Sequence, residues 1–61
     1  MLTFKVDANY GLERRAFSQN VIAHTPEIAA GVAERFILAK MIGATATDKT
    51  VNIIEVREVR H

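Results

Sequence analysis

The chain has 61 residues and a mass of 6.8 kDa, so it has room for one small domain over residues 1–61, because ordinary domains contain roughly 100 to 150 residues. Cysteine is absent, which excludes disulfide bonds and thiolate-bound metals, and a formal net charge of +1 excludes a strong electrostatic attraction to nucleic acid or anionic membranes. With 49% hydrophobic residues the chain is too apolar for disorder, so we expect packing or association to stabilise it.

The distribution of apolar residues bears on the cellular location. The longest uninterrupted apolar run, residues 36–39, is far shorter than the ~20 residues that a membrane-spanning helix requires. The N-terminal residues alternate between apolar and polar, whereas a secretory signal has a continuous apolar stretch. We therefore expect a cytoplasmic protein without a membrane span.

Two strands are predicted in the first part of the chain. Residues 2–10 alternate strictly and place five apolar side chains on one face: Leu2, Phe4, Val6, Ala8 and Tyr10. A turn at residues 9–11, where Gly11 tolerates positive φ, leads into a returning strand from about residue 14 to 24. Gln19 interrupts the inner face of that strand. Either a bulge near residues 18–20 or an edge position with Gln19 in solvent explains it.

A helix is predicted from Pro26 to Ile42. Thr25, Pro26 and Glu27 provide an N-cap hydroxyl, a proline at the first helical position and a carboxylate in the first turn, and Gly43 ends the helix. Gly31 indicates either a close approach to another backbone or a tolerated, exposed glycine. At 100° per residue, one arc is predicted to face the sheet, formed by Ile28, Ala29, Val32, Ala33, Phe36 and Ala39.

After a polar loop over residues 44–49, a last strand is predicted from Thr50 to about Val59. Its adjacent residues Ile53 and Ile54 must face opposite sides of the sheet. The element order predicts an α+β fold, a ββαβ domain with a three-stranded sheet in the order 2-1-3 and the helix on one face. The expected core contains Phe4, Val6, Val21, Val32 and Phe36.

The apolar surplus of the chain predicts an interaction surface. Ile37, Leu38 and Met41 lie outside the predicted sheet-facing arc, and Ile22 and Ile54 fall on the predicted open face of the sheet. Exposed apolar patches on small domains usually mark contacts with proteins. Three interpretations stay open: a loop or the last strand covers Leu38 and Met41, the patch joins two copies in a two-fold homodimer, or it binds a different protein.

Basic residues offer a second kind of site. Arg14 and Arg15 follow the first turn, and Arg57 and Arg60 lie near the C-terminal end, so together they could form an edge that holds phosphates. Acidic residues lie among them, and cross-strand ion pairs explain the arginines at least as well. The phenylalanines fall on predicted core faces and leave only Tyr10 to stack on a base.

Catalytic and metal-binding constellations are weak. His24 could lie near Asp7, and Ser18 is a further polar group, but no spacing connects the three residues. Glu58 and His61 have a short spacing at a terminus, which is a poor place for a metal site. We therefore expect no enzymatic activity, no cofactor and no metal.

The overall layout resembles short β-β-α-β accessory proteins of bacteria, phages and mobile elements. The resemblance is carried by a hairpin whose second strand ends in residues 21–27, Val-Ile-Ala-His-Thr-Pro-Glu, and leads into an alanine-rich helix. Members of that group include inhibitors of host defence systems, which act by docking onto a surface. The resemblance implies a non-enzymatic protein that binds and modulates another protein. A small nucleic-acid-binding regulator is the alternative.

Overall fold

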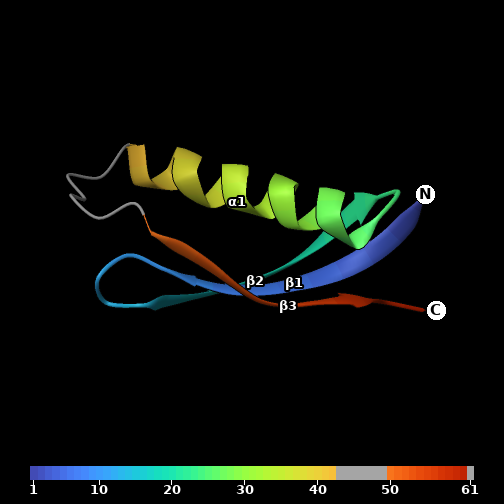
Figure 1. Cartoon of the computed structure of the whole chain (residues 1–61), viewed down its shortest axis with the longest axis horizontal. Helices are drawn as coiled ribbons and strands as arrows, with labels where there is room; N and C mark the ends of the chain where they lie inside the picture. Colours follow the sequence, from blue (N-terminus) through green and yellow to red (C-terminus); the bar gives the residue numbers. More distant parts are fainter. Residues whose placement is uncertain (43–49, 61) are drawn as a thin grey trace.

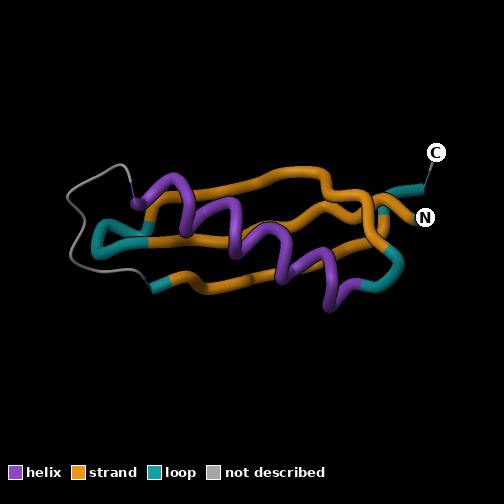
Figure 2. Tube along the Cα trace, turned by 90° about the horizontal axis from the view of Figure 1, so that it is seen from above, coloured by secondary structure: helices purple, strands orange, loops and turns teal. Residues whose placement is uncertain are grey.

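The computed structural model describes residues 1–42 and 50–60, and these form a three-stranded sheet with one helix across one face (Figure 1). The elements are β1 (Leu2–Tyr10), β2 (Arg15–Ala23), α1 (Pro26–Ile42) and β3 (Val51–Glu58). The sheet has the order β2-β1-β3, and β1 pairs antiparallel with both neighbours. The predicted ββαβ fold and strand order are confirmed. Figure 2 shows α1 running diagonally over the sheet.

The hairpin between β1 and β2 has an unbroken register from Leu2↔Ala23 to Tyr10↔Arg15. The turn lies later than predicted, because residues 9 and 10 still belong to β1 and the chain reverses over residues 11–14. Gly11 has the expected positive φ of 75°, and the Arg14 amide donates to its carbonyl at 3.2 Å. Arg14 itself has a φ of 50°, a left-handed conformation that is unfavourable for a residue with a side chain.

Of the two explanations for Gln19, the edge position is confirmed, and the bulge of the sheet lies in β3. Gln19 pairs in regular register with Val6, and its side chain is exposed because β2 is an edge strand. On the other side of β1, Asp7 pairs with Glu55 and Ala8 with Ile53, so Ile54 is an extra residue in a bulge. Ile53 packs against the core, whereas Ile54 is exposed, as the adjacent isoleucines predicted.

The start of α1 follows the sequence signal. The Ile28 amide donates to Thr25 Oγ1 at 3.2 Å and the Ala29 amide to the Thr25 carbonyl at 3.1 Å, so the predicted cap is formed. The predicted stop at Gly43 and the loop over residues 44–49 lie outside the described residues. Gly31 is exposed, and a Cβ built there meets nothing within 4 Å, so it is a tolerated glycine and not a point of close approach.

The rotation of α1 differs from the prediction. The helix packs on the sheet through residues four apart, which we call the inner row: Ala29, Ala33, Ile37 and Met41. The prediction that Val32 and Phe36 belong to the core is wrong, since both are exposed. The prediction that Ile37 lies outside the sheet-facing arc is also wrong, since it is fully buried. The inner row prevails because its two alanines let the helix backbone approach the sheet closely, while larger side chains there would hold it away.

The core consists of two connected clusters under the helix. Phe4, Val6 and Val21 pack with the alanines of the inner row, as predicted for the three strand residues. Towards the hairpin, Ala8 packs with Ile37 and Met41, and Phe17 and Ile53 contact both clusters. Among the described residues no helix is long and apolar enough to cross a membrane.

Candidate interaction surface

The most extensive apolar surface of the helix lies one residue before the inner row. We call this the outer row, and it consists of Ile28, Val32 and Phe36, whose exposed fractions are 50%, 45% and 45%. Residues four apart on a helix lie one above the other, so these side chains form a continuous stripe along α1. Half-exposed large apolar side chains in one stripe are typical of a surface that contacts another molecule.

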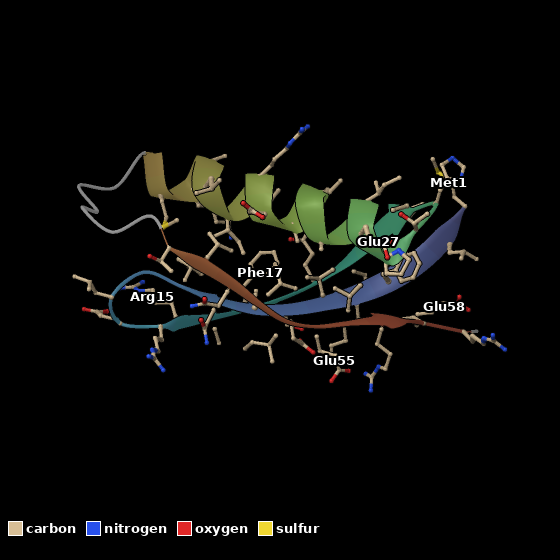
Figure 3. The ribbon with its side chains drawn as sticks, viewed as in Figure 1. Met1, Arg15, Phe17, Glu27, Glu55 and Glu58 are labelled. Carbon is tan, nitrogen blue, oxygen red and sulfur yellow. The ribbon has the colours of Figure 1, made fainter. Side chains whose placement is uncertain are left out.

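An aromatic contact places the outer row on the β2 side of the helix. The ring centroids of Phe36 and Phe17 are 6.2 Å apart, and the rings are tilted by 48°. Phe17 points from β2 toward the helix in Figure 3. Lys40 Nζ lies 5.3 Å from the centroid of Phe36 and 5.9 Å from that of Phe17, close enough for a cation–π interaction with both rings.

The edge strand beside the outer row has no charged residue over most of its length. In β2, residues 16–23 read Ala-Phe-Ser-Gln-Asn-Val-Ile-Ala, and the strand contains neither proline nor a bulge. Natural edge strands are usually protected from unwanted pairing by charges, prolines or bulges. We call β2 together with the outer row the β2 flank. It combines an unprotected strand edge with an apolar helix stripe.

The opposite edge, β3, has the protection that β2 lacks. The bulge at Ile54 interrupts its pairing, and three of its last four residues, Glu55, Arg57 and Glu58, are charged. Arg57 Nε lies 3.9 Å from a Glu55 carboxylate oxygen along the strand. The two edges of the sheet are thus chemically different, and β2 lacks the charges and the bulge that hinder strand pairing at β3.

The interface residues predicted from sequence, Leu38, Met41, Ile22 and Ile54, do not form one surface in the structure. Met41 is only 4% exposed and Leu38 is partly buried, both packed in the cluster that includes Val51 and Ile53. Coverage by the last strand, one of the three interpretations, therefore applies to them. The sequence interpretation missed the outer row because it assigned those residues to the core. The four-residue spacing of the outer row was the sequence signal that could have identified it as one stripe, but the inner row has the same spacing.

Ile22 and Ile54 are both 65% exposed, yet they do not form a patch. Ile22 lies opposite Thr3, whereas Ile54 lies beside the Asp7 and Ala8 positions of β1. Four to five residues along a strand correspond to roughly 13 to 17 Å, and the two isoleucines are also on opposite edge strands. Polar positions of β1 and β2 lie between them, including Lys5, which pairs with Asn20, and Asp7, which pairs with Ser18.

The four arginines are not brought together. Arg14 and Arg15 lie at the hairpin end, whereas Arg57 pairs with Lys5 and Arg60 follows β3 at the far end; Figure 3 shows Arg15 and Glu58 at opposite ends of the sheet. Three of them lie near carboxylates two residues away: Arg15–Glu13 at 3.5 Å, Arg57–Glu55 at 3.9 Å and Arg60–Glu58 at 2.9 Å. All of these pairs are largely exposed, so they contribute little to stability.

The polar residues considered for catalysis are also separated. His24 is exposed and directly follows Ala23, which pairs with Leu2, while Asp7 pairs with Ser18 five residues further along β1. That separation is roughly 17 Å. His61 lies outside the described residues. Among the described ones, no three histidine, aspartate or glutamate side chains are grouped so that they could hold a metal ion.

Comparison with known proteins does not assign the chain. No protein-family model matches it, and no curated protein or solved structure is significantly similar to it. The function must therefore be inferred from the surfaces.

Proposed function

We propose that the chain is a non-enzymatic interaction protein that binds and modulates another protein, in the manner of the small accessory proteins of phages and mobile elements. The observation that carries the proposal is the outer row: Ile28, Val32 and Phe36 are about half exposed in one continuous stripe. A chain of this size gains stability by burying apolar groups, and leaving three large ones in water is unfavourable without a compensating role.

The strand edge supports the same proposal. A partner that docks on the β2 flank can cover the outer row with apolar side chains and pair its backbone with β2, which is a frequent mode of peptide and protein recognition. The arginines favour this proposal over nucleic-acid binding, because they are spread from the hairpin turn to the end of β3 and three of the four lie near a carboxylate. A phosphate-binding surface requires several cations on one face.

Affinity capture from the native host tests the function. The wild-type chain is compared with an outer-row variant, Ile28→Gln with Val32→Gln, and with a matched control, Leu12→Gln with Ile54→Gln, which changes exposed apolar residues outside the β2 flank. We expect the wild type and the control to retain the same protein and the outer-row variant to lose it. Circular dichroism and thermal melting verify that all three chains are folded.

Two results would contradict the proposal. Retention of DNA or RNA that falls steeply with salt and is lost on replacing Arg14 and Arg15 by alanine would support the nucleic-acid alternative. Equal loss of the partner in the outer-row variant and the control would show that the outer row is not the docking surface.

A further inference from the structure

We propose that β2 pairs antiparallel with β2 of a second copy of the chain, forming a six-stranded sheet with both helices on one face. This inference rests on the proposed function, which assigns the β2 flank to protein contact. It identifies a second copy of the chain as the molecule that pairs with the strand edge. The physical basis is the contrast between the edges: β2 has free backbone groups and no charge over residues 16–23, whereas β3 has a bulge and charges.

Symmetry restricts how two β2 strands can pair. Residues directly opposite each other in a sheet point to the same face. When a two-fold axis perpendicular to the sheet relates two identical strands, the residue at the axis must therefore pair with the same residue of the second copy. β2 has nine residues, Arg15–Ala23, and the middle one is Gln19. Only the register centred on Gln19 pairs the strand over its full length.

That register is chemically compatible along the whole strand. It places Phe17 opposite Val21 on the helix side, and Ile22 opposite Ala16 on the open side. Arg15 lies opposite Ala23, so no like charges face each other, and the exposed Gln19 meets its own copy. Two side-chain amides can hydrogen-bond to each other, because each has both donors and an acceptor. The polar residue between Phe17 and Val21 on the helix side of β2 thereby gains a role.

The side of the chain that carries the β2 flank is comparable in area to one partner's share of a dimer interface. The Cα atoms extend over 38 × 16 × 16 Å, so one long side measures 38 by 16 Å, or about 600 Å² before side chains are added. Stable specific interfaces bury roughly 800 Å² per partner. An interface of about 800 Å² corresponds to about 18% of the 4506 Å² accessible surface of the chain.

Pairing through β2 also defines the surface that the dimer presents. The two β1 strands would be three strand spacings apart, or about 14 Å, and each helix lies across its own sheet (Figure 2). Directly packed helices are 8 to 10 Å apart, so the outer rows of the two copies would border a shallow apolar channel above the junction. Dimerisation therefore occupies the β2 edge and leaves the outer rows of both copies exposed for the partner of the proposed function.

A charge-swap experiment tests the register. Gln19→Lys and Gln19→Glu change an exposed residue, so each monomer should fold, but each dimer would oppose two like charges at the axis. In sedimentation velocity across a wide concentration range, we expect the wild type to reach twice 6.8 kDa. Each variant should dimerise roughly fivefold more weakly, and an equimolar mixture of the two should recover the wild-type affinity.

The matched control is Ile54→Lys, which adds a charge to the protected edge and should leave dimerisation unchanged. Hydrogen exchange provides a second readout: backbone amides of β2 should become protected with rising concentration while those of β3 do not. The melting temperature should also fall on dilution, because association stabilises the folded state.

Failure of the inference can be separated from failure of the proposed function. A mass near 6.8 kDa at every concentration, or a dimer that Gln19→Lys does not weaken, would overturn pairing through β2. A dimer lost in the Ile28→Gln, Val32→Gln variant but unaffected at Gln19 would place the contact on the helices alone and would also overturn it. Partner capture in the native host does not depend on either result.

Discussion

Two neighbouring rows of the same helix have opposite environments. The inner row and the outer row both repeat every four residues, and both are entirely apolar, yet Ile37 is 0% exposed and its neighbour Phe36 is 45% exposed. Helical periodicity alone would accept either row as the face against the sheet. Apolar character therefore does not distinguish the two rows. What distinguishes the inner row is the pair of small residues Ala29 and Ala33, which pack directly on the strands.

The largest expected effect is at the centre of the inner row. Replacing Ile37 by alanine removes a fully buried side chain and leaves a cavity beside Ala8 and Met41, so the free energy of unfolding should fall by about 2 to 5 kcal/mol. Urea denaturation at one fixed protein concentration measures the change. A loss smaller than that of Phe36→Ala would show that the two rows are wrongly assigned.

The corresponding change in the outer row should be milder. Phe36 is half exposed, so Phe36→Ala should cost about 1 kcal/mol, through the lost contacts with Phe17 and Lys40. Phe36→Leu, which keeps an apolar side chain but removes the ring, separates the aromatic contribution from simple coverage of Phe17. A destabilisation of Phe36→Ala as large as that of Ile37→Ala would return this residue to the core, as the sequence had predicted.

The smallest effect is a stabilisation. Gly31 lies on the exposed side of α1, and a Cβ built there meets no atom within 4 Å. Gly31→Ala should raise the free energy of unfolding by about 0.5 to 1 kcal/mol, because alanine favours the helix. Thermal melting at equal concentration measures it, with Ala39→Gly, another exposed helix position, as the reverse control. A destabilised Gly31→Ala chain would mean that this side of the helix is covered.

Much of the fold could be predicted from local sequence patterns. The alternation in β1, the hairpin glycine and the Thr25 cap each depend on a few adjacent residues, and all three were correctly placed to within a few positions. The hairpin turn was shifted, because the conformation of Arg14 depends on the way the two strands meet. For Gln19 the sequence left a bulge and an edge position open, since a polar residue in the inner face looks the same in both cases. The bulge in β3 was not predicted.

The candidate surface could be predicted only in part from the sequence. Ile22 and Ile54 were correctly expected to be exposed, but their distance from each other depends on the register of both edge strands with β1. Met41 was expected at the surface and is buried, because β3 returns beneath the C-terminal end of α1 and packs against it. Such contacts join residues far apart in the chain, and no local period reveals them.

The sequence by itself determined the type and order of the elements, because strand alternation, turn glycines and helix caps act through hydrogen bonds and side-chain spacing within a few residues. It also determined that the chain has more apolar residues than one small core requires. The tertiary structure alone decided which apolar residues are left over. Once Ala29 and Ala33 bring the helix against Phe4 and Val6, rigid helical geometry turns the outer row toward water.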